Sequence, residues 1–264
     1  MDANWNRRVP IGLEEFGGDK QFATTLARGL ELLRCFTPER PVLGNGELAA
    51  MLQLPKATIS RLTYTLLCLG YLSATEFYGK YQLGAATLSL GYPLITQFPF
   101  RRNAQPLMLE LAKQLDCNVS VGIRDRFSIV YLEVVRSSGR AVYAHDVGSQ
   151  HPLLGTAIGR AYLLGCTADA RTALLNQIRV KEPKQWSRYG AKALESVQQY
   201  PVHGCCTSVG EILPDVQAVA VPLGRIRGTD VAALSCTFQG RLLDIDWLRK
   251  DVAPRLQALA KEIG

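Results

Sequence analysis

The sequence predicts two domains: an N-terminal winged helix-turn-helix and a following α+β domain built on an antiparallel sheet. Three observations lead to this prediction. The chain has 264 residues, which is long for a single domain. Its first third has the order helix, short helix, turn, helix and β-hairpin, which is typical of a winged helix-turn-helix. The remainder combines β-rich runs with amphipathic helices, as in an α+β layout.

Composition narrows the class of protein. Apolar residues make up 47% of the chain, enough for real hydrophobic cores. No uninterrupted run of about 20 apolar residues occurs, so we expect no transmembrane helix and no membrane partner. Residues 1–20 mix both charge signs and lack the apolar stretch of a signal peptide. We therefore expect a cytoplasmic protein that begins with a flexible tail over residues 1–20.

Helical periodicity and turn residues divide residues 21–84 into the elements of the first domain. A helix over 22–36 places Phe22, Leu26, Leu30 and Leu33 on one face. Gly70 is a normal C-terminal glycine for the third helix, and the Tyr78-Gly79-Lys80 turn favours a hairpin. The expected elements are helices over 22–36, 46–53 and 55–69 and a hairpin over 71–84.

The third helix has two distinct faces. Ile59, Leu62, Leu66 and Leu69 are spaced 3, 4 and 3 residues apart and predict one buried stripe. The opposite face is small and polar with two cations, and no acid occurs between Glu47 and Glu76. Small residues allow close approach to base edges, and Arg and Lys reach guanine or phosphate. Candidate DNA-binding residues are Lys56, Ala57, Thr58, Ser60, Arg61, Tyr64 and, from the hairpin, Lys80.

Two alternatives stay open for this helix. Charged helix faces are usually only solvated, so the two cations alone do not establish a nucleic-acid contact. Tyr64 could instead pack against the first helix or the hairpin.

A helical connector is expected over 85–99, interrupted near Gly91 and Pro93, and residues 100–264 form the second domain. Its expected helices cover 103–115, 156–165, a polar stretch to about 200, and 243–263. Its expected strands cover 117–124, 128–136, 140–147, 217–224 and 230–238.

Several segments, in order, resemble the IclR family of bacterial transcriptional regulators. ELAAMLQLPKATISRLTYTLLCLGYL resembles the family's helix-turn-helix, and KYQLG resembles the exit of its wing. VGSQHPLLGTAIGRAYLLG resembles the motif that opens the effector pocket, and the stretch from Val209-Gly210-Glu211 to ALSCTF resembles the closing half. The resemblance covers nearly everything from residue 22 to the C-terminus.

This resemblance implies a winged-helix domain, a linker helix and a GAF-like α+β domain that binds a small molecule. It also implies homodimers, often paired into tetramers, that act on promoter DNA, with RNA polymerase as a further candidate partner. Family effectors are typically small organic acids or aromatic catabolites, and no cofactor is implied.

The effector site that the resemblance implies starts at the helix opening at residues 155–159. Free N–H groups there can hold a carboxylate without a charged side chain. Alternatively, the glycines permit tight packing and the hydroxyls satisfy local backbone groups. The candidate effector-binding residues are Gly155, Thr156, Ala157, Ile158, Gly159, Ser208, Ala218, Ser235, Thr237 and Val119.

Three departures from the family pattern favour a less polar pocket. Leu154 replaces a polar residue, Ser208 replaces a common acidic residue, and Ala218 occupies a cysteine position. We therefore expect the effector to be an aromatic or similarly apolar carboxylic acid.

Other chemistry has little support in the sequence. The seven cysteines are scattered, mostly in apolar contexts such as that of Cys68, and predict core thiols rather than disulfides. One cluster, formed by His203, Cys205 and Cys206, has groups that could bind a metal or sense thiol oxidation, but no fourth metal ligand is evident. His145-Asp146 lacks a nucleophile, and no hydrolase, Walker or zinc-protease motif occurs. We expect no enzyme and no metal. The alternative is a sensory module whose helix-turn-helix binds protein.

Overall fold

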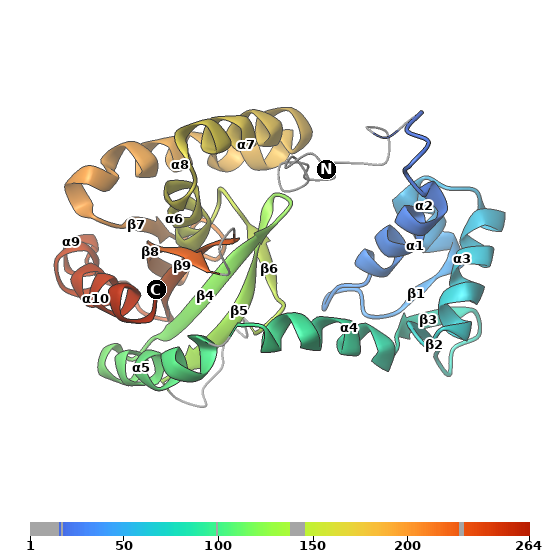
Figure 1. The fold of residues 1–264 in the computed structure, drawn as a ribbon, viewed down its shortest axis with the longest axis horizontal. Helices are drawn as coiled ribbons and strands as arrows, with labels where there is room; N and C mark the ends of the chain where they lie inside the picture. Colours follow the sequence, from blue (N-terminus) through green and yellow to red (C-terminus); the bar gives the residue numbers. More distant parts are fainter. Residues whose placement is uncertain (1–15, 17, 99, 138–145, 227–229) are drawn as a thin grey trace. The chain divides into compact units, whose positions relative to one another are not determined.

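The structure, a computed structural model, describes residues 16, 18–98, 100–137, 146–226 and 230–264. The chain divides into two compact units between Gln97 and Phe98 (Figure 1). Most of the tail expected over residues 1–20 lies outside the described residues.

The first unit contains the predicted winged helix-turn-helix. Its three strands form an antiparallel sheet in the order β1-β3-β2. The strand β1 was not predicted, because a two-residue strand is too short to show alternation. The elements are α1 (Thr24–Arg34), β1 (Leu43–Gly44), α2 (Asn45–Leu52), α3 (Lys56–Cys68), β2 (Leu72–Ala74), β3 (Lys80–Leu83) and α4 (Ala85–Thr96).

Local sequence explains where these helices start and stop. Gly44 donates its N–H to the Glu47 carboxylate at 2.7 Å, which caps the start of α2. The helix was predicted to begin at Pro55, but α3 begins at Lys56. Pro55 directly precedes it, with φ −56° and ψ 140°. Gly70 follows α3 with φ +75°, a left-handed conformation that favours glycine and turns the chain into the wing.

The core of this unit corrects two expectations. Ile59, Leu62 and Leu66 are buried as predicted, but Leu69 is 60% exposed because α3 ends at Cys68. Thr63 completes the buried face instead, and its hydroxyl donates to the Ile59 carbonyl at 3.0 Å. The thiol expected in the core at Cys68 is exposed for the same reason.

The predicted apolar face of α1 was wrong at two of its four positions, although Leu33 is partly buried against the core. Leu26 is 64% exposed and Leu30 is 50% exposed, whereas Leu32 is fully buried. The helix buries its C-terminal end, where Leu32, Cys35 and Phe36 join the core with α2 and α3. Periodicity alone therefore identified an apolar stripe of α1 but not the stripe that packs.

The connector helix α4 is continuous from Ala85 to Thr96, so the predicted interruption was wrong. Pro93 lies inside it and removes one N–H donor, which would otherwise bond the Ser89 carbonyl. Ser89 is exposed, so water can satisfy that carbonyl. No residue of α4 is buried, and its leucines at 88, 90 and 94 are all exposed.

The second unit is built on a six-stranded antiparallel sheet in the order β6-β5-β4-β9-β8-β7. Its strands are β4 (Asn118–Asp125), β5 (Ser128–Arg136), β6 (Gln150–Pro152), β7 (Cys206–Val209), β8 (Val216–Ile226) and β9 (Asp230–Gln239). Its helices are α5 (Phe100–Leu115), α6 (Ala157–Gly165), α7 (Ala168–Lys181), α8 (Pro183–His203), α9 (Ile245–Trp247), the π-helical turn η3 (Leu248–Val252) and α10 (Ala253–Ile263).

Strand alternation sends side chains to two different layers. Val119, Val121 and Cys236 pack with α5 and α10 in the main core. The other face of the sheet carries α6, with α7 and α8 beyond it (Figure 1). Gly122 allows this close packing, because a Cβ there would come within 2.9 Å of the Ile158 side chain.

Differences from the prediction are concentrated in short or irregular elements. The strands β6 and β7 were missed, and the final helix is divided into α9, η3 and α10. Of the strand expected over 140–147, residues 140–145 lie outside the described residues, and Val147 lies in a turn. In the described ranges, no helix combines the length and the hydropathy that crossing a bilayer requires.

Candidate functional site

The start of α3 presents the predicted polar face to solvent. Lys56, Ala57, Ser60 and Arg61 are exposed, and Thr58 is half-buried. The first N–H groups of a helix have no intrahelical acceptor and lie at the positive end of its dipole. The face therefore combines two cations, free N–H donors and small side chains.

Tyr64 belongs to this exposed face. Its side chain is 69% exposed, so it does not pack into the first helix or the hairpin. This removes one of the two alternatives for Tyr64 that the sequence left open.

One contact joins α2 to α3, and another joins β3 to α2. Asn45, the first residue of α2, donates its side-chain N–H to the Ser60 hydroxyl at 3.3 Å. Asn45 was not among the predicted residues, because only the fold brings the two helix starts together. Lys80, expected on DNA, places its ammonium 2.6 Å from the Glu47 carboxylate. The hydrogen bond from Lys80 is the main reason why the pKa of Glu47 is lowered. The charge of Lys80 therefore already has an acidic partner.

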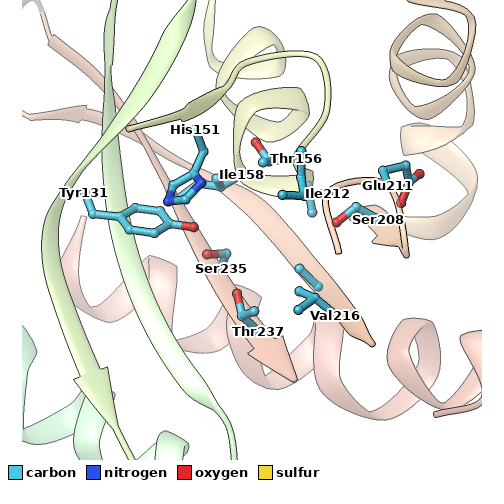
Figure 2. A pocket seen from close by; sticks show the side chains of 12 residues that line it. Tyr131, His151, Thr156, Ile158, Ser208, Glu211, Ile212, Val216, Ser235 and Thr237 are labelled. Carbon is cyan, nitrogen blue, oxygen red and sulfur yellow. The ribbon is translucent and has the colours of Figure 1, made fainter. Parts of the chain in front are cut away.

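The second unit contains a pocket between the start of α6, the β7–β8 loop and the sheet (Figure 2). It holds about 420 Å³ of space, part of which is open to solvent. The lining residues are Tyr131, His151, Thr156, Ala157, Ile158, Ser208, Glu211, Ile212, Val216, Ala218, Ser235 and Thr237.

Seven of the ten candidate effector residues line this pocket, and three do not. Val119 lies on the opposite face of the sheet, in the main core, because side chains alternate along β4. A Cβ on Gly159 would clash with the Leu153 backbone, and one on Gly155 would come within 2.9 Å of Ile212. These close contacts favour the packing interpretation for the two glycines.

The first turn of α6 forms one wall of the pocket. Thr156 caps the helix: its hydroxyl oxygen accepts the Gly159 N–H at 3.2 Å and its O–H donates to the Pro152 carbonyl at 3.1 Å. Ala157 and Ile158 are buried against the pocket, and their N–H groups belong to the first turn, which has no intrahelical acceptors. This wall therefore offers partial positive charge without a charged side chain.

A buried ion pair holds two walls of the pocket together. Arg160 is 1% exposed, and its guanidinium lies 3.2 Å from the Glu211 carboxylate. It also donates to the carbonyls of Leu154 at 3.0 Å and Thr207 at 2.6 Å. The second Glu211 oxygen accepts the Val209 N–H. Arg160 thus joins α6 to the β7–β8 loop, from which Glu211 faces the pocket.

The floor of the pocket carries hydroxyl groups. Ser235 is 1% exposed, and its hydroxyl has no hydrogen-bond partner among the described residues. Ser208 and Thr237 are also buried and line the same space. Because buried polar groups are normally hydrogen-bonded, the Ser235 hydroxyl is free to bind a ligand.

Tyr131 and His151 were not predicted as pocket residues. They lie on β5 and β6, and their ring centroids are 5.1 Å apart. Burial lowers the pKa of His151 to about 4, so its imidazole is neutral at physiological pH. No sequence signal indicated this wall, because β6 is only three residues long. Ile212 and Val216 were missed because they belong to a loop and to the end of a strand.

The cysteine cluster has no metal-binding geometry. Within the ranges that the structure describes, no three His, Cys, Asp or Glu side chains come together to hold a metal ion. Burial raises the pKa of Cys205 to about 11 and that of Cys206 to about 12. Both thiols therefore stay protonated near neutral pH, which makes them poor nucleophiles.

Comparisons with known proteins match both units. The family model for the bacterial transcriptional regulator IclR C-terminal matches residues 93–264, and the IclR helix-turn-helix domain matches residues 25–76. The HTH-type transcriptional regulator TsaQ1/TsaQ2 of Comamonas testosteroni is 32% identical over 258 residues, which cover 97% of this chain and 92% of that protein.

Solved structures agree with these matches. An IclR family transcriptional regulator from Brucella abortus is 40% identical with a TM-score of 0.85, over 97% of this chain and 96% of that one. An IclR homologue complexed with 4-hydroxybenzoate, from Microbacterium hydrocarbonoxydans, is 19% identical with a TM-score of 0.67, over 90% and 97% of the two chains. At that identity, the second structure shows a shared fold alone.

Proposed function

Because the chain belongs to the IclR family of bacterial transcriptional regulators, we propose that it binds promoter DNA through α3 and an aromatic carboxylic acid through the pocket of the second unit. The observation that carries the DNA-binding part is the exposed start of α3, where Lys56 and Arg61 flank small polar residues. We assign it a cytoplasmic role in binding rather than in catalysis.

The proposed DNA complex is that of a dimer. Two recognition helices would enter successive major-groove faces of a near-palindromic site, about one helical turn apart. Exposed leucines on α1 and α4, at positions 26, 30, 88 and 90, support association of two copies through the first unit. Pairing of dimers into tetramers and contact with RNA polymerase belong to the same proposal.

The chemistry of the pocket supports an acid with an apolar body. The start of α6 provides N–H donors for a carboxylate, and Ile158, Ile212 and Val216 provide apolar surface. The IclR homologue from Microbacterium hydrocarbonoxydans, which shares this fold, forms a complex with 4-hydroxybenzoate, an acid of this kind. That homologue supports the compound class, which we extend to this chain by analogy.

Regulation requires the two sites to be linked. A ligand shifts a conformational equilibrium only by its differential affinity for the two states. We propose that the acid favours one relative placement of the two units, through the connector that contains α4. DNA affinity then changes because the spacing of the two recognition helices changes.

The DNA-binding part is tested with labelled DNA from the intergenic region beside the gene. We expect fluorescence anisotropy to show binding that weakens steeply with salt, since phosphate contacts release counterions. Ser60→Ala or Lys56→Ala should reduce the preference for this DNA over random DNA. Equal affinity for every sequence would contradict sequence-specific recognition, and no binding to any DNA would favour the protein-interaction module instead.

The effector part is tested by thermal shift. Benzoate and 4-hydroxybenzoate should raise the Tm of the full chain in a concentration-dependent way, because a ligand that binds only the folded state stabilises it. Pyruvate and glyoxylate serve as small, highly polar comparison acids. Stabilisation by those two alone would contradict an aromatic effector.

A further inference from the structure

We infer that the second unit carries a DNA-contacting surface of its own, a row of cations on α7 and α8 that binds the phosphate backbone of promoter DNA without reading its sequence. We name Arg179, Lys184, Arg188 and Lys192 the basic row. The inference goes beyond the proposed function and rests on it, because the DNA that the row contacts is the DNA that α3 binds.

Positive charge is concentrated where α7 ends and α8 begins. Residues 179–192 contain five Lys or Arg residues and one acid, Glu182, which leaves a net charge of +4. This short segment supplies more than half of the formal net charge of +7 of the whole chain. Residues 244–262, at the C-terminal end of the same unit, contain four Lys or Arg and four Asp or Glu residues. Their charges therefore cancel, whereas those of residues 179–192 do not.

The basic row is exposed and regularly spaced. Lys184, Arg188 and Lys192 follow one another at intervals of four residues on α8, so they share one face of the helix, about 6 Å apart along its axis. All three are exposed, as is Arg179 in the last turn of α7. The three side chains on α8 therefore form a line of positive charge on the surface.

Helix stability does not account for this placement. Lys184 is the second residue of α8, and the first turn of that helix contains no acid. The helix dipole is positive at this end and favours acids rather than cations there. A cation at this position and the helix dipole both attract an anion, so the start of α8 is suited to a phosphate group.

A row of this kind suits a regularly charged polymer. Its cations are spread along α8 instead of surrounding a cavity, so no single small anion can contact them all. Ser187 and Ala191 are exposed beside the row and are small, so this part of α8 lacks the large apolar side chains typical of the core of a protein–protein interface. DNA offers a continuous line of phosphates. Charge complementarity therefore favours DNA over a protein partner.

One end of the row also contacts the β7–β8 loop. The Lys192 ammonium lies 3.5 Å from the Glu211 carboxylate, and Arg188 donates to the Glu211 carbonyl at 3.5 Å. Glu211 lines the effector pocket. Among the described residues, by contrast, no carboxylate forms an ion pair with Arg179 or Lys184. These two residues can therefore be changed without removing a contact to the pocket.

Anisotropy titrations of the full chain with labelled intergenic DNA, at a series of KCl concentrations, test the basic row. We expect Arg179→Gln combined with Lys184→Gln to reduce the slope of log affinity against log salt by about 0.9 for each lost phosphate contact, or about 1.8 in each protomer. The loss of affinity should be the same factor for intergenic and random DNA, because phosphate contacts carry no sequence information. Arg179→Lys combined with Lys184→Arg keeps both charges and should bind as the wild type does.

Arg255→Gln combined with Lys261→Gln is the matched control, since it removes one arginine and one lysine from exposed positions of α10 in the same unit. It should leave the slope unchanged. Equal slopes in the wild type and both Gln variants, or equal reductions in both Gln variants, would overturn the inference and leave α3 as the DNA-binding helix. If the wild type binds no DNA at all, the proposed function fails together with the inference, which is a distinct result.

Discussion

Helices α3 and α6 each contain an alanine, an isoleucine and an arginine, in that order, among their first six residues. The two arginines have opposite surroundings. Arg61 is exposed on the polar face of α3, whereas Arg160 is buried under the pocket and bonds three segments of the second unit. Similar helix starts thus form part of an exposed surface in one unit and part of a pocket wall in the other.

This difference shows that burial determines what a helix start can bind. An exposed start with free cations can meet a long polyanion such as DNA. At the buried start of α6, Arg160 is paired with the Glu211 carboxylate. Only backbone N–H groups and hydroxyls remain to contact a ligand, and these suit one small anion. The predictions below test this contrast, beginning with the largest expected effect.

Removing the buried cation should be strongly destabilising. We expect Arg160→Met to lower the free energy of unfolding by about 3–5 kcal/mol, because it leaves the Glu211 carboxylate buried without its guanidinium. Arg61→Met, the matched change on the exposed face, should alter it by less than about 0.5 kcal/mol. Urea unfolding followed by tryptophan fluorescence and far-UV circular dichroism measures both, and equal effects would contradict the contrast.

The buried face of α3 and the residue that follows the helix offer a second test. We expect Leu66→Ala to lower the free energy of unfolding by about 2–5 kcal/mol, since it leaves a cavity among α1, α2 and α3. Leu69→Ala removes the same side chain at an exposed position and should change stability by less than about 0.5 kcal/mol. Chemical unfolding followed by circular dichroism distinguishes these outcomes. A large loss from Leu69→Ala would restore the four-residue apolar stripe that the sequence predicted.

Cations on the first unit should differ in their contribution to DNA binding. We expect Arg61→Ala to weaken binding to the intergenic DNA by about 1–3 kcal/mol, roughly fivefold to more than a hundredfold. Lys80→Ala should weaken it by less than about 1 kcal/mol, because this ammonium is already paired with Glu47. Anisotropy titrations at one fixed salt concentration compare the two variants. A larger loss from Lys80→Ala would place the main contact on the wing.

Sequence periodicity and helix-ending residues predicted most of the architecture correctly. The spacing of Ile59, Leu62 and Leu66 and the position of Gly70 predicted both the buried face and the end of α3. Periodicity failed where the chain offers two apolar stripes, as in α1, because only tertiary packing selects one of them. The exposed face of α3 could be predicted from the sequence because it depends on the periodicity of one helix alone.

The pocket was less predictable because it depends on contacts between distant residues. Arg160 and Glu211 are 51 positions apart, and no local pattern links them. Tyr131 and His151 come together only through the register of the short edge strand β6. Val119 was misplaced by one step of strand alternation, which sends its side chain to the other layer. Such features follow from sheet pairing rather than from any single segment.

The most direct test of the account removes one backbone donor from α6 and measures DNA binding. Ala157 is the first residue of α6, where proline is tolerated, and Thr156 has the extended backbone that precedes proline (φ −121°, ψ 147°). Ala157→Pro therefore deletes one N–H from the first turn of α6, at a residue that lines the pocket, and Ala157→Gly is the control that keeps it. Both variants should bind the intergenic DNA as the wild type does when no acid is present.

The decisive measurement is the DNA affinity of these proteins in a titration with 4-hydroxybenzoate. The account predicts that the acid changes the DNA affinity of the wild type and of Ala157→Gly, and that Ala157→Pro needs a concentration at least about tenfold higher for the same change. An identical response of all three proteins would contradict the claim that the enclosed helix start of α6 binds the acid that controls the exposed helix start of α3.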